Sequence, residues 1–144
     1  MCAEHSNERL SRKLRSAGLR PSTARVHVLR YLDRNRNHPT VDQIYRSLLE
    51  SLPGLSRASV YNSLAALGRA GLVRPLAMDG NELRYDSSVG DHGHFRCRGC
   101  GVIYDFDLPP AVSASAADGL QGFQVDRHDF LAWGLCPGCA GAGR

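Results

Sequence analysis

The stretch TVDQIYRSLLESLPGLSRASVYNSLAALGRAG, residues 40–71, predicts two helices separated by a tight turn. Thr40 and Gln43 match a capping box, in which each side chain satisfies a backbone N–H of the other residue at a helix start. Pro53–Gly54 interrupts the first helix, and Ser56 is a typical N-cap residue for the second. Two short helices joined in this way are typical of a helix-turn-helix motif.

The helix boundaries extend this prediction in both directions. The first helix is expected to run to about Leu52, and the second to span Ser56–Ala70, because Gly71 is a typical residue just past a helix end. Upstream, residues 6–17 and a stretch that starts at Pro21 place apolar residues at helical spacing. Three or four helices therefore precede residue 71.

After the helices, two short apolar strands flank Asp79–Gly80, which predicts a hairpin. Helices followed by such a hairpin predict a winged helix-turn-helix domain over residues 1–85. Past a hinge at residues 86–91, residues 92–144 suggest strands, one short helix and up to two more strands over 121–133. The predicted fold class is α+β, a winged helix followed by a small α/β domain.

The charges are divided unevenly between these parts. Residues 1–85 contain 14 Lys and Arg against 7 Asp and Glu, whereas residues 86–144 contain 4 against 7. A basic half joined to an acidic half favours a nucleic-acid binder with an attached sensor, although a basic surface can also be merely solvated. The chain starts without an apolar targeting segment and has no apolar run of membrane length, which predicts a cytoplasmic protein without a membrane partner.

Two C-x-x-C pairs, Cys97/Cys100 and Cys136/Cys139, have the spacing of a zinc site. Four thiolates complete a tetrahedral site with no open position, so we predict a structural Zn(II) that stabilises the small second domain. Disulfides are the main alternative and are rare in a reducing cytoplasm. A redox switch, in which the thiols lose zinc on oxidation, also remains open.

A second group of residues offers nitrogen and oxygen ligands. His92 and His94 alternate along a predicted strand, so both face one side, while Asp86 and Asp105 lie on flanking segments. His38 precedes a helix of the first domain. Such a set suits Fe(II) or Mn(II), although a His-x-His pair can be a solvated strand face and a lone histidine a surface cap.

An enzyme is a weaker interpretation of the same residues. A zinc-dependent nucleobase deaminase needs H-x-E followed by P-C-x-x-C. Here no Glu lies two residues after His92 or His94, and the second cysteine pair follows Leu135 rather than a proline. We therefore expect no catalytic residues and no substrate.

Taken together and in order, six short motifs resemble the ferric uptake regulator family over roughly residues 8–139. They are GLRPSTAR (18–25), HPTVDQIY (38–45), SVYNSL (59–64), RYD (84–86), DHGHFRCRGC (91–100) and CPGC (136–139). The resemblance implies a homodimeric, metal-dependent repressor that binds a palindromic double-stranded DNA operator, with its dimerisation domain at the C-terminus.

The resemblance also implies a regulatory metal site at His38, Asp86, His92, His94 and Asp105. Aspartate at positions 86 and 105 is similar to the peroxide-responsive subgroup, as is Asn62 after Tyr61. In that subgroup Fe(II) reacts with hydrogen peroxide, a histidine gains an oxygen and DNA is released, which makes His38 and His92 the expected oxidation targets. An iron- or manganese-responsive repressor that ignores peroxide is the alternative.

One further family metal site is expected to be absent or weak. Two of its ligand positions are Asp91 and Gly93 in this chain, and glycine has no side chain to offer. Only His128 matches a remaining ligand, and a structural role is the simpler interpretation of that histidine.

The expected DNA contacts come from the predicted recognition helix, from Arg20 just before the helix that starts at Pro21, and from Arg25 within that helix. Tyr61 is expected to contact a thymine methyl group and Asn62 an adenine edge, unless Tyr61 packs against the wing. Arg20 resembles a family residue that enters the minor groove, while Arg25 and Arg57 are expected to contact phosphates. The full expected set is Arg20, Arg25, Ser56, Arg57, Ser59, Tyr61 and Asn62.

Overall fold

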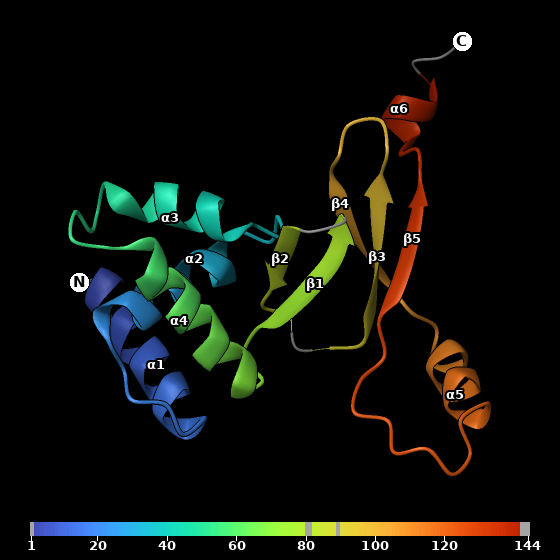
Figure 1. Cartoon of the computed structure of the whole chain (residues 1–144), viewed down its shortest axis with the longest axis horizontal. Helices are drawn as coiled ribbons and strands as arrows, with labels where there is room; N and C mark the ends of the chain where they lie inside the picture. The colour runs from blue at the N-terminus through green and yellow to red at the C-terminus, as the bar shows by residue number, and fades with distance from the viewer. Residues whose placement is uncertain (1, 80–81, 89, 142–144) are drawn as a thin grey trace. The chain divides into compact units, whose positions relative to one another are not determined.

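The structure, a computed structural model, describes residues 2–79, 82–88 and 90–141 (Figure 1). The chain divides into two compact units, Met1–Val89 and Gly90–Arg144. Among the described residues, no helix is both long enough and apolar enough to cross a membrane. The expected hinge at 86–91 includes Val89, which lies outside the described residues.

The described residues of the first unit form four helices and a two-stranded hairpin. Its buried side chains come mainly from the apolar faces of the helices, with Leu29, Ile44 and Leu64 almost completely excluded from solvent. The elements are α1 (Cys2–Ser16), α2 (Thr23–Arg34), α3 (Val41–Leu49), α4 (Arg57–Arg69), β1 (Arg74–Asp79) and β2 (Glu82–Asp86).

The helix-turn-helix predicted from residues 40–71 is present. Thr40 and Gln43 form the predicted capping box of α3, and Ser56 caps α4 by accepting a hydrogen bond from the Ser59 N–H. Gly71, at φ +69°, follows the end of α4 in the left-handed region that glycine adopts without strain.

Several helix boundaries differ from the prediction, and α1 begins at Cys2 rather than near residue 6. Helix α2 begins at Thr23 rather than Pro21, because the Ser22 hydroxyl accepts the Arg25 N–H and so takes the N-cap position. Helix α3 ends at Leu49, before the predicted end near Leu52, and a tight turn continues the chain.

The hairpin of the first unit is antiparallel, with Leu76 opposite Arg84. Gly80 and Asn81, which were expected in its turn, lie outside the described residues. The segment before α3 joins this hairpin through a bridge between Thr40 and Arg84. The Tyr85 N–H donates to the Pro39 carbonyl at 3.0 Å, so residues 38–40 lie directly beside β2.

The second unit is a three-stranded sheet in the order β4-β3-β5, with β3 antiparallel to β4 and parallel to β5. The segment 121–133 was expected to hold one or two strands, and among the described residues it contains only the first part of β5. Helix α6 was not predicted. The elements are β3 (His92–Cys97), β4 (Ile103–Asp107), α5 (Pro110–Asp118), β5 (Phe130–Gly134) and α6 (Pro137–Gly141).

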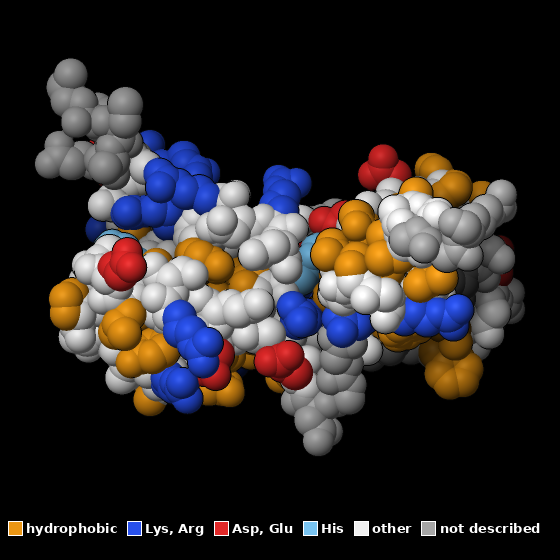
Figure 2. Space-filling view, turned by 90° about the horizontal axis from the view of Figure 1, so that it is seen from above, with side chains coloured by type: hydrophobic (Ala, Val, Ile, Leu, Met, Phe, Trp, Pro, Cys, Tyr) orange, Lys and Arg blue, Asp and Glu red, His pale blue; other side chains and the backbone are white. Residues whose placement is uncertain are grey.

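This second unit has a thin core. Among its side chains that the structure describes, the buried apolar ones are Cys97, Ile103 and Cys136. Apolar side chains instead gather on part of its surface, at the right of Figure 2, where some Lys and Arg side chains also lie. The exposed large apolar residues of the second unit are Val102, Tyr104, Phe106, Val112, Phe123, Val125, Trp133 and Leu135.

Candidate metal centres and nucleic-acid interface

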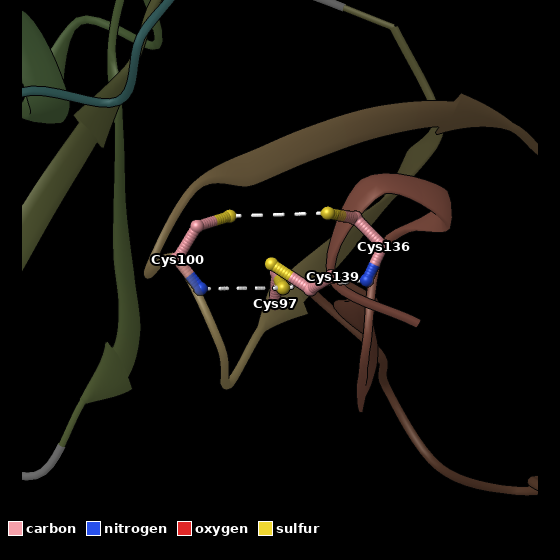
Figure 3. A group of neighbouring side chains, drawn as sticks. All are labelled: Cys97, Cys100, Cys136 and Cys139. Carbon is pink, nitrogen blue, oxygen red and sulfur yellow. Dashed lines mark hydrogen bonds between the residues drawn. The ribbon is translucent and has the colours of Figure 1, made fainter. Parts of the chain in front are cut away.

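The four cysteines of the C-x-x-C pairs form one cluster at the end of the sheet of the second unit (Figure 3). Their Sγ atoms all lie within 4.8 Å of one another, and the Cys100 and Cys136 sulfurs are 3.9 Å apart. Tetrahedral zinc with Zn–S bonds of about 2.3 Å places its sulfurs about 3.8 Å apart. The cluster therefore fits the predicted Zn(II), and the two pairs close a loop through α5 and β5.

Backbone N–H groups point at the sulfur atoms of this cluster. The N–H groups of Cys100 and Cys136 donate to Cys97 Sγ at 3.5 and 3.3 Å, and they hold the pKa of the Cys97 thiol down to about 6. A hydrogen bond to the Cys136 sulfur raises the pKa of Cys139 to about 12. A bound cation would displace the protons that remain on these thiols.

Tyr104 adds a side-chain hydrogen bond to the cluster, which sequence analysis did not predict. The Cys139 N–H and the Tyr104 hydroxyl both lower the pKa of Cys136, and the same contact raises the pKa of Tyr104 to about 12. Tyr104 and Cys136 also line one small hollow with Phe95. An aromatic residue in a strand is too common a feature to mark this role from sequence alone.

Two glycines allow the cysteines to approach one another. A Cβ on Gly99 would lie 2.9 Å from Cys139 Sγ, so a larger residue would separate the pairs. Gly101, at φ +74°, turns the chain so that its N–H donates to the Cys97 carbonyl at 2.9 Å.

His92, His94 and Asp105 lie on one face of the sheet, because His94 on β3 pairs directly with Asp105 on β4. Their ligand atoms converge: the two histidine Nε2 atoms are 3.1 Å apart. Asp105 Oδ1 lies 3.8 Å from Nε2 of His92 and 3.6 Å from Nε2 of His94. His92 Nδ1 donates to the Gly90 carbonyl at 2.8 Å, which leaves the Nε2 lone pair for a cation.

His38 and Asp86 occupy neighbouring segments of the first unit, and both are buried. His38 has φ +49°, an uncommon conformation for a residue other than glycine and one that points to a functional constraint. The Arg84 guanidinium holds the His38 carbonyl at 3.1 Å, and Asp86 Oδ1 accepts the Ser88 N–H at 2.8 Å. The structure thus brings three of the predicted ligands together in one unit and places the other two side by side in the other.

The structure gives a physical reason for the expected loss of the further family site. A Cβ on Gly93 would overlap the ring of Phe106, so this ring fills the space that a ligand side chain would need. His128 stacks on Phe130 with ring centroids 6.2 Å apart and belongs to none of the ligand clusters that the described residues form.

Gly93→Ala is expected to destabilise the second unit by about 1 kcal/mol, the low end of the overpacking range, because the added methyl group displaces the partly exposed Phe106 ring. Thermal unfolding of the zinc-loaded protein should show a lower midpoint, and a second change, Phe106→Leu, should recover part of the loss. Gly90→Ala is the control, since a Cβ there meets nothing within 4 Å. Equal stability of the two single variants would contradict the close packing.

The predicted DNA-contacting residues occupy the start of α4, the first turn of α2 and the segment before α2. Tyr61 and Asn62 are exposed on α4. The Ser56 and Ser59 hydroxyls are 2.9 Å apart within the helix cap. Arg25 Nη1 donates to the Arg20 carbonyl at 2.8 Å and so fixes the segment that carries the exposed Arg20.

Comparison with known proteins agrees with this architecture. The profile of the "Ferric uptake regulator family" matches residues 16–131. Transcriptional regulator FurA of Mycobacterium tuberculosis is 41% identical over 133 residues, covering 89% of this chain and 88% of that protein. The peroxide-responsive repressor PerR of Staphylococcus aureus is 34% identical over 137 residues, covering 94% and 93%. The ferric uptake regulator structure of Helicobacter pylori, described as having three functional metal-binding sites, superposes with a TM-score of 0.73 at 25% identity, covering 95% and 93%.

Proposed function

This chain belongs to the ferric uptake regulator family, and on that premise we propose that it senses hydrogen peroxide and releases DNA when a histidine ligand of its regulatory metal is oxidised. As a family member it is a metal-dependent transcriptional repressor that binds operator DNA as a dimer, not an enzyme. We place its action in the cytoplasm. The exposed apolar surface of the second unit would form the dimer contact.

The main support for this proposal is that the ligand atoms of His92, His94 and Asp105 lie close together. Two Nε2 atoms 3.1 Å apart beside a carboxylate suit a borderline cation such as Fe(II) or Mn(II). We propose that His38 and Asp86 of the first unit complete the ligand set. The left-handed backbone at His38 supports this role, because such strain persists where function requires it.

A ligand set drawn from both units would couple metal binding to DNA binding. Asp86 ends β2 of the first unit, and β3, which carries His92 and His94, begins only six residues later. Five ligands around one cation would restrain the segment between them and so fix the angle between the units. In a dimer this angle sets the spacing of the two recognition helices, which a palindromic operator matches.

Peroxide would act on the histidine ligands of this set. His38 and His92 would be ligands of an iron(II) ion, whose one-electron chemistry would split the peroxide O–O bond. In the net reaction a ring C–H of the histidine becomes C–OH, and the second peroxide oxygen leaves as water. An oxidised ring at His38 or His92 would be a poorer ligand, so the restraint on the two units would weaken.

A metal-responsive repressor without peroxide sensing is the second candidate. The Helicobacter pylori ferric uptake regulator, described as having three functional metal-binding sites, agrees with this candidate. Aspartate rather than glutamate at positions 86 and 105 favours the peroxide sensor, because a shorter side chain holds its carboxylate differently beside the cation. The relative named a peroxide-responsive repressor, which aligns over 94% of this chain, agrees with that choice.

Metal-dependent DNA binding is expected in a selection from random duplex DNA. The zinc-loaded dimer should enrich an inverted repeat when Mn(II) is present and none when it is absent. His94→Ala should lower the affinity of the Mn(II)-loaded protein for the enriched duplex about 5–150-fold, the usual range of coupling between sites. Fluorescence anisotropy with the labelled duplex measures the loss.

His128→Ala is the matched control, since His128 stacks on Phe130 outside the ligand clusters. It should bind Mn(II) and the enriched duplex as the unchanged protein does. Equal DNA affinity with and without Mn(II) would contradict a regulatory metal, whereas loss of binding in His128→Ala would point to a further site.

A further inference from the structure

Arg57 is the first residue of α4, and its side chain is held against α3. Its Nε lies 3.4 Å from Asp42 Oδ1, although both side chains are exposed to solvent, by 57% and 50%. Its guanidinium carbon also lies 5.4 Å from the centroid of the Tyr45 ring, within the range of a cation–π contact. Two independent contacts therefore hold the Arg57 guanidinium beside α3.

The ion pair lies in a hollow of about 330 Å³ between α3, α4 and β2. Two acidic residues line this hollow, Asp42 and Glu82, and they differ in their partners. Asp42 faces Arg57 of the recognition helix, whereas Glu82 lies 3.9 Å from Arg84 of the same strand. The remaining lining residues are Thr40, Val41, Tyr61, Leu83 and Tyr85.

We propose that Asp42 is a positioning residue, which keeps Arg57 away from DNA phosphates and so lowers the affinity for DNA of any sequence. This inference rests on the proposed DNA-binding function and revises the expectation that Arg57 is a phosphate contact. A phosphate contact adds affinity for every sequence and carries no sequence information. Withholding one therefore lowers the affinity for every sequence by about the same factor and flattens the salt dependence of binding.

The gain in DNA affinity expected on removal of the Asp42 charge is large enough to measure. An exposed ion pair shifts an equilibrium by a factor of about 2 to 5, and an exposed cation–π contact adds a similar factor. Each phosphate that a protein neutralises changes the slope of log affinity against log salt by about 0.9. Because the Tyr45 contact remains in the variant, Asp42→Asn should free Arg57 only in part, with a gain of about 2- to 5-fold.

The test is a salt titration of Mn(II)-loaded protein on one labelled duplex of random sequence. Asp42→Asn should raise the affinity about 2- to 5-fold and steepen the salt slope by up to about 0.9. Arg57→Gln alone should change the affinity less than about 2-fold, since the native guanidinium is turned to α3. The double variant should match Arg57→Gln. Circular dichroism of each variant confirms the fold.

Glu82→Gln is the matched control, because it removes the same charge from the same hollow without touching Arg57. If Glu82→Gln raises the DNA affinity as much as Asp42→Asn does, or if the double variant keeps the higher affinity, the gain comes from the change in net charge and not from Arg57. Either result would overturn the inference. A flatter slope for Arg57→Gln alone would show a native phosphate contact and also overturn it. Absence of DNA binding by the unchanged protein would instead refute the proposed function on which the inference rests.

Discussion

Replacing Cys97 with Ser is expected to release the zinc ion and to unfold the second unit. Cys97 ends β3, and its sulfur accepts N–H groups from both halves of the cluster, at Cys100 and Cys136. With three ligands left, the site no longer closes. The few buried apolar residues of this unit cannot replace a zinc site, whose binding free energy is about 10–16 kcal/mol in small zinc domains.

Three measurements follow this loss: zinc per chain by elemental analysis, secondary structure by circular dichroism, and mass by light scattering. The variant should contain little zinc, lose strand signal and elute as a monomer. Cys2→Ser, which changes the cysteine outside both C-x-x-C pairs, should keep zinc and the dimer. A folded, zinc-bound dimer of Cys97→Ser would contradict the structural role of the cluster.

Exposure of the Fe(II)-loaded protein to dilute hydrogen peroxide is expected to abolish binding to the metal-selected duplex. The reason is the loss of one ligand from the proposed set, since removal of even an outer partner of a metal ligand weakens binding about 10- to 100-fold. The Mn(II)-loaded protein should keep its DNA affinity under the same treatment, because Mn(II) does not supply the same reaction with peroxide.

Asp105→Glu separates peroxide sensing from metal binding. Asp105 lies 3.6 Å from Nε2 of His94, and the longer side chain keeps the charge while it moves the carboxylate. This variant should still bind DNA with Mn(II) or Fe(II) but resist peroxide. If Asp105→Glu and the unchanged protein lose DNA at the same peroxide dose, the aspartate is not what makes this site sensitive.

Much of the fold follows from local sequence. The Thr40–Gln43 capping box, the Ser56 cap and Gly71 are short-range signals, and each lies where it was expected. The four-cysteine cluster was equally predictable, because a thiolate pair at C-x-x-C spacing is a local unit and a zinc ion joins two such units.

Other features depend on contacts between segments that are distant in sequence. Nothing local predicts that Phe106 covers Gly93 or that the Tyr104 hydroxyl reaches Cys136. The left-handed backbone at His38 is likewise set by its surroundings, where Arg84 of β2 binds its carbonyl. Arg57 shows the same limit, since nothing local in the sequence predicts its contacts with Asp42 and Tyr45 of α3.

The most direct test of peroxide sensing is peptide mass spectrometry after Fe(II) and dilute peroxide. Tryptic cleavage separates His38, on residues 37–46, from His92 and His94, on 85–96, and from His128, on 128–144. The account predicts one added oxygen atom on His38 or His92, with fragment ions separating His92 from His94, and none with Mn(II) or on His128. Unmodified His38 and His92 peptides in a protein that still binds the selected duplex would contradict it.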